Sequence, residues 1–393
     1  MKKTIRDINV EGKRVLVRVD YNVPINTDLK IVDDSRITGT IPTLTYLIEH
    51  GAKVILCSHL GRPNGQVEPK MSLRPVLARL SQLLDKPISF AEDVTNKSTL
   101  EMVNKMNNGD VLMLENIRFY KEEEKNDEAF AKKLASLADI FVLEAFATAH
   151  RKHASTYGVA KLIPAVCGFL VEHELNMFDK VLNKPEHPFV AILGGAKVSD
   201  KLPVIENLLD KVDTILIGGG MSYTFIKAIG GNVGMSLVDN SKLDLAKEIM
   251  DRAKEKNVKI VLPIDNVGAK EFSEDSETKM FSSGFFADDY QGMDIGKKTI
   301  KIFKKYIKKA RTIVWNGPLG VYEYEKFKHG TNKIAKYVAK SKALSVVGGG
   351  DSVAAIQSLG VSRKVTHMST GGGASLALLQ GKPLPCIEAI EDV

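Results

Sequence analysis

The chain has 393 residues, of which 44% are apolar and 26% are charged, and its formal net charge is +7. This length suffices for two domains, and the ordinary composition excludes disordered and fibrous proteins. The positive balance permits an anionic partner but does not favour nucleic acid over a phosphorylated metabolite.

The N-terminal segment and the cysteines indicate the cellular compartment and exclude some kinds of site. MKKTIRDINVEGKR lacks the apolar core of a secretory signal, and no apolar run reaches the roughly 18 residues of a membrane helix. Cys57, Cys167 and Cys386 are too few and too far apart for a disulfide framework or a paired-cysteine metal site. We expect a cytoplasmic monomer with three buried cysteines and with neither a nucleic-acid nor a membrane partner.

Short apolar runs alternate with helical patterns through the first half of the chain. The runs are apolar on both faces, which is typical of parallel strands buried between helices. They lie at 14–20, 53–59, 110–116 and 139–146, and a helical pattern occupies 72–84. Alternation of this kind predicts a parallel sheet with right-handed crossovers.

A predicted helix separates this half from a second series of strands. Val171, Leu175, Phe178 and Leu182 share one helical face, and the polar NKPEHP ends the pattern. Further strand-like runs lie at 188–195, 213–220, 259–265, 311–318 and 343–350, with a helical pattern at 243–256. The segment 270–284 has strand-like pieces between polar turns and is predicted to be an antiparallel excursion.

The predicted fold class is therefore α/β, with two doubly wound, Rossmann-like parallel-sheet domains joined by a long interdomain helix. The predicted boundaries are 1–167 for the first domain, 168–187 for the helix and hinge, 188–372 for the second domain, and 373–393 for a C-terminal segment that packs back toward the first domain. In open sheets of this class, ligands bind beyond the carboxyl ends of the strands, so the residues that follow each strand are the candidates for a site.

Polar and basic residues follow the strands of the first half. Arginine forks match phosphate and carboxylate oxygens two at a time, so several arginines at one sheet edge predict a small, multiply anionic ligand. The candidates are Asp20, Asn22, Arg36, His59, Arg62, Arg118, His150, Arg151 and His153. Taken singly, a histidine here fits a structural role and an arginine a surface charge, so it is their number that indicates a site.

Glycines follow the strands of the second half, in LGGAKVSDK, IGGGMSYTF, WNGPLGVYE, GGGDS and TGGGAS. Bare backbone admits a flat ring and a phosphate chain, and helix N-termini donate amides to phosphates. One such turn indicates little, because many α/β turns need glycine for packing, but five in one half predict a nucleotide site. The fingerprints G-x-G-x-x-G and G-x-x-x-x-G-K-[ST] both fail at GGGDS, since Val353 replaces the third glycine and no lysine follows.

Positive charge for the phosphates then has to come from another loop. Lys197 and Lys201 are four residues apart and share one face if their segment is helical. Asp351 fits a ligand, direct or through water, for Mg²⁺ carried by a nucleotide. The acidic run 121–125 is interpreted as a solvated helix start, and the lysines of 297–309 as the wet face of a helix and not as a nucleic-acid site.

At this point the sequence resembles the phosphoglycerate kinase family along its whole length. The resemblance is carried, in this order, by RVDYNVP, SHLGRP, ENIRFYKEEEKND, TAHRKHAST, LGGAKVSDK, IGGGMSYTF, WNGPLGVYE, GGGDSVAA and STGGGASL. It implies a two-domain hinge enzyme of glycolysis, a phosphotransferase with a carboxyl group as acceptor. Such an enzyme reversibly transfers the acyl phosphate of 1,3-bisphosphoglycerate to Mg-ADP, giving 3-phosphoglycerate and ATP, by direct in-line transfer after hinge closure.

The resemblance also implies roles for individual residues. The first domain would bind the phosphoglycerate through Asp20, Asn22, Arg36, His59, Arg62, Arg118 and Arg151. The second would bind ADP or ATP through Gly194, Lys197, Lys201, Gly218, Gly219, Asn316, Pro318, Glu323, Gly349, Gly350, Asp351 and Ser352. The residues implied to act on the phosphoryl group are Arg36, Lys197, Lys201, Gly350 and Gly373, and Asp351 would serve the magnesium.

The chain departs from the family pattern in a few places. Leu143, Glu144 and Ala147 stand where the family usually has Asn, Asp and Gly, Lys297 replaces a proline and Ala377 a glutamate. If the replaced glycine has a positive φ, alanine there costs about 1 kcal/mol. The shape of the turn after Glu144 is therefore open.

Two other functions stay open at this stage. A nicotinamide-dependent dehydrogenase fits a doubly wound fold, although the G-x-G-x-x-G fingerprint is missing. A non-catalytic sensor with the same fold fits the departures at 143–147. Mixing with NADH and following its fluorescence tests the first alternative, and a coupled assay for ATP formation tests the second.

Overall fold

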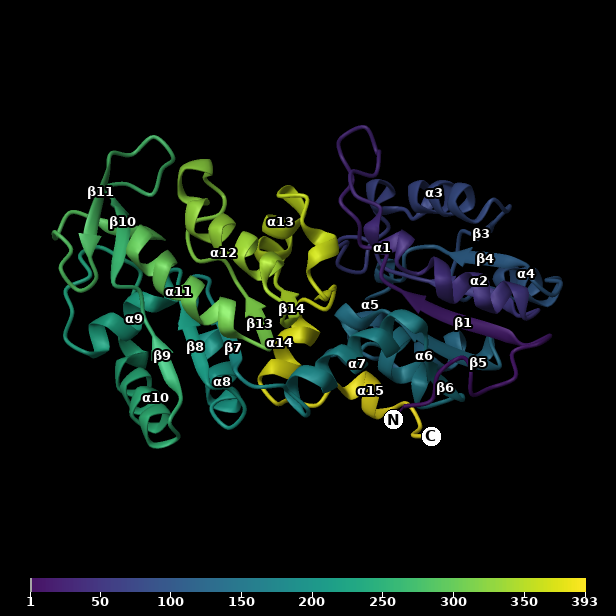
Figure 1. Cartoon of the computed structure of the whole chain (residues 1–393). Helices are drawn as coiled ribbons and strands as arrows, with labels where there is room; N and C mark the ends of the chain where they lie inside the picture. Colours follow the sequence, from purple (N-terminus) through teal and green to yellow (C-terminus); the bar gives the residue numbers. More distant parts are fainter. Residues whose placement is uncertain (1) are drawn as a thin grey trace. The chain divides into compact units, whose positions relative to one another are not determined.

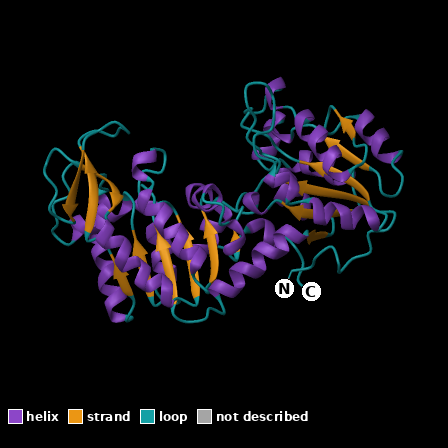
Figure 2. Cartoon of the chain, turned by 45° about the horizontal axis from the view of Figure 1, so that its top comes forward, coloured by secondary structure: helices purple, strands orange, loops and turns teal. Residues whose placement is uncertain are grey.

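Residues 2–393 are described in a computed structural model of the chain (Figure 1). The chain divides into two compact units. Unit 1 holds the residues up to Asn176 together with Pro383–Val393, and unit 2 holds Met177–Lys382. Each unit contains a six-stranded sheet, which Figure 2 shows in orange with helices packed along it.

The sheet of unit 1 is parallel throughout and has the strand order β3-β4-β2-β1-β5-β6. Its strands are β1 (Arg14–Val19), β2 (Lys53–Cys57), β3 (Ser89–Ala91), β4 (Val111–Leu114), β5 (Ile140–Glu144) and β6 (Ala165–Cys167). The helices of this unit are α1 (Ser35–Thr38), α2 (Ile41–Glu49), α3 (Arg74–Leu84), α4 (Lys97–Asn104), α5 (Lys121–Glu124), α6 (Glu128–Ser136) and α15 (Pro385–Glu388). The four predicted strands are confirmed, and each ends before the polar residues that follow it.

The sheet of unit 2 is also parallel and has the order β15-β14-β13-β7-β8-β9. Its strands are β7 (Phe189–Leu193), β8 (Thr214–Ile217), β9 (Lys259–Val261), β13 (Thr312–Asn316), β14 (Leu344–Gly348) and β15 (His367–Met368). The helices are α8 (Val198–Leu208), α9 (Met221–Ala228), α10 (Leu243–Glu255), α11 (Lys297–Lys309), α12 (His329–Lys340), α13 (Gly350–Ser358) and α14 (Gly373–Leu379). α11 buries Ile300, Phe303 and Ile307 and leaves most of its lysines in water, as predicted.

Continuous apolar runs form the central strands because helices cover both faces of each sheet. Every residue of β4, β5, β7, β8 and β13 is buried, and the alternation of a half-exposed strand is absent from them. In register, Val15 of β1 lies beside Val54 of β2 and Ile140 of β5. This parallel register brings the carboxyl ends of neighbouring strands to one edge in each unit.

The predicted antiparallel excursion is a separate three-stranded sheet in unit 2, with the order β11-β10-β12. Its strands are β10 (Asp265–Ala269), β11 (Thr278–Ser282) and β12 (Gln291–Ile295). The run predicted as one strand at 259–265 is two elements, because β9 ends at Val261 and β10 begins at Asp265. Leu262 and Pro263 interrupt it, and proline cannot donate to a sheet ladder.

The predicted helix between the two series is α7 (Phe169–Leu182). It ends before the polar NKPEHP, as the pattern indicates. Its buried side chains include Val171, Phe178 and Leu182. The chain passes from unit 1 to unit 2 within this helix, after Asn176, and returns to unit 1 after Lys382.

The strand predictions missed the short outer strands. β3, β6 and β15 have three, three and two residues, too few for a periodic pattern to stand out. Cys57, Cys167 and Cys386 are buried and free, as expected. Among residues 2–393, no helix combines the length and the apolar character that a membrane span requires.

Candidate functional site

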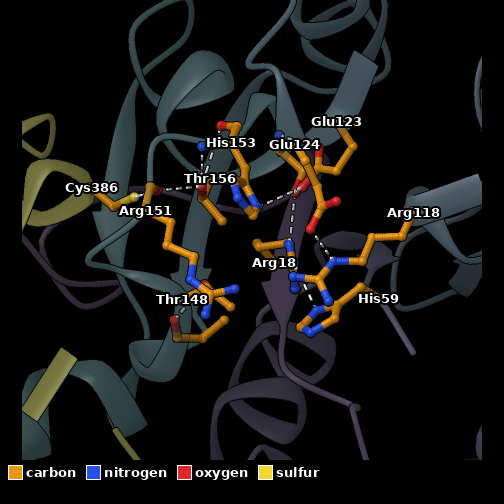
Figure 3. A network of polar contacts seen from close by, with 12 residues as sticks. Arg18, His59, Arg118, Glu123, Glu124, Thr148, Arg151, His153, Thr156 and Cys386 are labelled. Atoms are coloured by element: carbon orange, nitrogen blue, oxygen red, sulfur yellow. Dashed lines mark hydrogen bonds and ion pairs between the residues drawn. The ribbon is translucent and has the colours of Figure 1, made fainter. Parts of the chain in front are cut away.

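The predicted phosphoglycerate residues follow four adjacent strands of unit 1. In the sheet, β4, β2, β1 and β5 are neighbours, so their carboxyl ends share one edge. Asp20 follows β1, His59 follows β2, Arg118 lies in the 3-10 turn after β4, and Arg151 lies beyond β5. Figure 3 shows His59, Arg118 and Arg151 at this edge. The sequence prediction that they converge is consistent with this arrangement.

Arg118 has an unused donor at the edge. It is only 5% exposed, and its Nη1 donates to the Gly61 carbonyl at 2.9 Å. Its Nε lies 3.4 Å from Glu124 Oε1, yet this buried N–H has no hydrogen-bond partner among the described residues. Burial lowers the pKa of Arg118 from its usual value. Because an unpaired buried donor is costly, this N–H fits an anion that the site would bind.

Asp20, Asn22 and Arg36 form a second group at the same edge. Arg36 Nη1 pairs with Asp20 Oδ2. Asn22 is exposed, and its side-chain carbonyl accepts from Gly61 N at 2.9 Å, so the amide N–H donors are not used in this bond. Arg36 also lowers the pKa of His59 through its charge, so the two side chains belong to one electrostatic neighbourhood.

Arg62 and Arg151 are both exposed. The Nε of Arg151 donates to His150 Nε2 at 3.2 Å, and its charge contributes to lowering the pKa of His150 and His153. Long exposed arginines at the rim of a strand edge are free to reorient toward an incoming anion.

Sequence reasoning missed a buried network behind His59. Arg18 in β1 is 1% exposed, and Glu123 in α5 is fully buried. The interpretation of residues 121–125 as a solvated helix start is therefore wrong for Glu123, which points inward and accepts from Ser155 Oγ at 2.7 Å. A short acidic run does not reveal which of its members faces the core. The signal that could have marked Arg18 is its place inside a run that is buried on both faces, where a charge is unusual.

The departures at 143–147 are accommodated without backbone strain. Ala147 lies in a 3-10 turn (Phe146–Thr148) and is not among the residues with positive φ, so the conditional cost of alanine does not apply. The Glu144 carboxylate accepts from Thr43 Oγ1 at 2.5 Å and from Leu170 N at 3.2 Å, at the start of α7. Burial raises the pKa of Glu144 to about 7. Gly168 makes room for this carboxylate, since a Cβ there would collide with it.

In unit 2, the glycine loops line an open cavity at the carboxyl ends of β7, β13 and β14. Its volume is about 260 Å³. Eight predicted nucleotide residues line it, namely Gly194, Lys197, Lys201, Asn316, Pro318, Gly349, Gly350 and Asp351. The cavity also has lining residues that were not predicted: Gly195, Ala196, Asp200, Gly317 and Leu376.

The other predicted nucleotide residues do not line this cavity. Ser352 is buried beside it, where its Oγ accepts from Gly317 N at 2.9 Å, and this bond fixes one loop against the other. Gly218 and Gly219 follow β8, and Gly219 N donates to Leu319 O at 3.1 Å. Glu323 is exposed, and its charge raises the pKa of Asp351. Gly373 begins α14.

Lys201 lines the same cavity as the GGGDS loop, which has no lysine of its own. It lies in the first turn of α8, and its Nζ donates to Asn316 Oδ1 at the end of β13. Lys197 is the residue just before this helix, so the two lysines reach the cavity from one helix start. Burial lowers the pKa of Lys201 to about 8. Burial also raises the pKa of Asp351, with a smaller contribution from Glu323.

The glycines of the cavity serve two different purposes. At Gly194 a Cβ would collide with the Pro318 carbonyl, so glycine there is required by loop packing. At Gly350 a Cβ would meet nothing within 4 Å, and this residue starts α13 without a positive φ. Gly350 is therefore not required by packing, and its bare helix start leaves room for a phosphate.

Comparison with known proteins decides the family. The family model described as phosphoglycerate kinase matches residues 5–382. The chain belongs to the phosphoglycerate kinase family. It is 54% identical over 393 residues to a phosphoglycerate kinase from Finegoldia magna, covering 100% of this chain and 99% of the relative. A relative of the same description from Clostridium tetani is 52% identical over 394 residues, covering 100% and 98%.

Solved structures agree with this assignment. A phosphoglycerate kinase from Coxiella burnetii superposes with a TM-score of 0.89 at 41% identity, covering 99% of this chain and 98% of that one. One from Pyrococcus horikoshii gives 0.82 at 36% identity, covering 98% of each chain. The predicted α/β fold with two parallel-sheet units is confirmed, and the activity is phosphoglycerate kinase activity in glycolysis, EC 2.7.2.3. The dehydrogenase and sensor alternatives are set aside.

Proposed function

We propose that unit 1 binds the phosphoglycerate and unit 2 binds the nucleotide, and that the phosphoryl group passes directly between the two ligands. The observation that carries the first assignment is the cationic edge of unit 1, where Arg118 keeps a buried N–H that has no hydrogen-bond partner within residues 2–393. Asp20 and Asn22 bind the hydroxyl group of the phosphoglycerate and the oxygens next to it. His59, Arg62, Arg118 and Arg151 bind the phosphate that is not transferred, and Arg36 lies nearer the reacting end.

The assignment of the nucleotide rests on the cavity of unit 2. Backbone amides at the start of α13, together with Lys197 and Lys201, provide donors and positive charge for a phosphate chain. Gly218 and Gly219 bind the adenine region, and Asn316, Pro318 and Glu323 lie near the ribose and phosphates. Gly349, Gly350, Ser352 and Gly373 approach the phosphates with their backbone.

Magnesium fits this cavity as a cation that arrives with the nucleotide. Among residues 2–393 no group of three or more His, Cys, Asp or Glu is arranged to hold a metal. Two carboxylates, Asp200 and Asp351, line the cavity, and one or two carboxylates plus phosphates are the usual protein environment of Mg²⁺. Asp351 would hold the ion, and when bound Mg²⁺ would neutralise charge on the phosphate oxygens.

Catalysis in this proposal is positioning and charge neutralisation. An acyl phosphate already has a good leaving group and ADP is a ready nucleophile, so no general base is needed. Arg36 and Lys201 stabilise the charge that develops on the phosphoryl group during its transfer. The phosphate bound by Arg62 and Arg118 is not transferred and keeps its charge throughout. Because the ligands bind to different units, a closing movement at the hinge around Glu174 brings them together and excludes water. The protein acts as a cytoplasmic monomer.

Two kinds of measurement test this proposal. A coupled assay should show ATP formation from 1,3-bisphosphoglycerate and Mg-ADP, and a second assay should show the reverse reaction from 3-phosphoglycerate and Mg-ATP. With a γ-phosphate made chiral by oxygen isotopes, direct in-line transfer inverts the configuration at phosphorus, whereas a phosphoenzyme route retains it. Retention would contradict the direct transfer.

A further inference from the structure

Behind the carboxyl edge of the unit 1 sheet, a buried relay joins Glu123 to His59 through Ser155 and Arg18. Figure 3 labels Glu123, Arg18 and His59. Ser155 donates to the Glu123 carboxylate twice, from Oγ at 2.7 Å and from its backbone N at 2.9 Å. The same Oγ accepts from Arg18 Nε at 2.8 Å. Arg18 Nη2 lies 3.1 Å from His59 Nδ1, and Arg18 Nη1 donates to the Val19 carbonyl.

Arg18 determines the donor directions of this relay. Its Nε–H can only donate, so a lone pair of Ser155 Oγ faces Arg18 and the single hydroxyl proton of Ser155 points to Glu123. A guanidinium has five N–H donors and no acceptor, so the His59 Nδ1 that faces Arg18 has to accept. In a neutral ring the proton then resides on Nε2.

The surroundings keep this ring neutral. His59 is 4% exposed, and burial lowers the pKa of His59 well below its usual value. The charges of Arg18, Arg118 and Arg36 lower this pKa further. The contact with Arg18 is the one hydrogen bond that the His59 ring makes within residues 2–393, so Nε2 is left for a ligand.

We propose that Arg18, held in place by Glu123 through Ser155, is a positioning residue that fixes His59 in its Nε2–H tautomer. This inference rests on the proposed function, in which His59 binds the non-transferred phosphate. His59 then donates a hydrogen bond to a phosphate oxygen without adding a further charge to a site that already has several arginines. In the opposite tautomer an Nε2 lone pair would face the phosphate and repel it.

Arg18 needs the Glu123 carboxylate as a counter-charge because its guanidinium is buried away from water. A buried guanidinium without a counter-charge is strongly unfavourable, and Glu123 is the fully buried carboxylate beside it. Two other titratable groups face Glu123 and its neighbours: His153 Nδ1 lies 3.8 Å from Glu123 Oε1, and Glu124 faces Arg118. Burial lowers the pKa of His153 to about 4, so at neutral pH it adds no charge to the pair.

The first test reads the tautomer directly and needs no substrate. Long-range ¹H–¹⁵N correlation of the histidine rings, with His59 assigned by comparison with His59→Gln, should show a neutral Nε2–H ring at pH 7. A cationic ring, an Nδ1–H ring or an averaged mixture would overturn the proposal. Since no ligand is present, such a failure is distinguishable from a failure of the phosphoglycerate assignment.

The second test removes the relay while keeping charges balanced. Arg18→Met/Glu123→Gln deletes the buried pair as a unit, so no unpaired charge is left in the interior. We expect His59 to lose its single tautomer and the KM for 3-phosphoglycerate to rise about tenfold, the worth of one good hydrogen bond to a charged group, with a much smaller change in kcat. Ser155→Ala, which breaks the relay but keeps both charges, should give a weaker shift in the same direction.

The matched control is Glu122→Gln, an exposed acid next to Glu123 on the same helix, which should change neither readout. Arg18→Lys keeps a donor and a charge and should restore the Nε2–H tautomer in part. If the double variant and Ser155→Ala lower the melting temperature but leave the tautomer and KM unchanged, the relay is merely structural and the proposal is wrong.

Discussion

In our proposal both candidate sites bind phosphate oxygens at the carboxyl edge of a parallel sheet, but the groups that line the two sites differ. In unit 1 the charge comes from arginine and histidine side chains, and a buried layer of Arg18, Ser155 and Glu123 supports them. In unit 2 the site is mostly bare backbone, with cations supplied by Lys197 and Lys201 at one helix start. A site of charged side chains needs internal counter-charges, whereas a glycine site needs close packing between loops.

The largest expected effect distinguishes a residue that acts on the phosphoryl group during its transfer from residues that only bind a substrate. Lys201→Ala should lower kcat by about 10²–10³, because a donor aimed at developing charge acts mainly in the transition state. KM for either substrate should change much less. Lys201→Arg should not restore the rate fully, since a planar fork cannot replace a compact ammonium. Steady-state kinetics with both substrates varied measures this, and an unchanged kcat would remove Lys201 from the reaction.

Substitution of Arg62, an exposed arginine of unit 1, should change KM and not kcat, the opposite of the Lys201 result. Arg62→Ala should raise the KM for 3-phosphoglycerate about 10- to 100-fold, since a hydrogen bond to a charged group contributes about 1.5–3 kcal/mol. Its contact is the same in ground and transition states, so kcat should be nearly unchanged. If Arg62→Ala and Lys201→Ala have the same kinetic signature, the division between binding and transfer is wrong.

The pH dependence should come from unit 2. Burial places the pKa of Lys201 near 8, so the charged form predominates below about pH 8 and is lost above it. The kcat/KM for the nucleotide, which reports the free enzyme, should therefore fall about tenfold per pH unit on the alkaline side of this pKa. In Lys201→Arg, whose guanidinium stays protonated, this limb should vanish. A limb that persists in Lys201→Arg would assign the titration to another group.

The smallest expected effects distinguish Gly350, which leaves room for a ligand, from Gly194, which is required by loop packing. Gly350→Ala adds a methyl group to open space, so it should weaken nucleotide binding by about tenfold or less while leaving the melting temperature unchanged. Gly194→Ala forces a Cβ against the Pro318 carbonyl and should cost about 1–3 kcal/mol of stability, the usual cost of overpacking. Calorimetric binding and thermal unfolding of both variants distinguish the two purposes. Equal destabilisation by both changes would contradict the distinction.

The same contrast explains what the sequence could predict. Glycine runs and arginines at strand ends can be read directly from the sequence. For this reason most of the residues that line the unit 2 cavity were predicted, and so were the basic residues at the edge of unit 1. Glu123 was not, because a residue in an acidic run reveals its burial only through the partners that the fold brings to it, here Ser155 from beyond β5. Glu144 likewise departs from the family pattern, and only the packing of Thr43 and Gly168 shows how the longer carboxylate fits. The three short outer strands were too brief for periodicity to detect.

The most direct test of this account is a crossed binding experiment. Binary calorimetric titrations with 3-phosphoglycerate and with Mg-ADP would be made on Arg118→Ala and on Asp351→Ala. We expect Arg118→Ala to lose affinity for 3-phosphoglycerate while keeping its affinity for Mg-ADP, and Asp351→Ala to show the reverse. If either substitution weakens both ligands equally, or if Asp351→Ala binds Mg-ADP as tightly as the unaltered chain, the assignment of one ligand to each unit is contradicted.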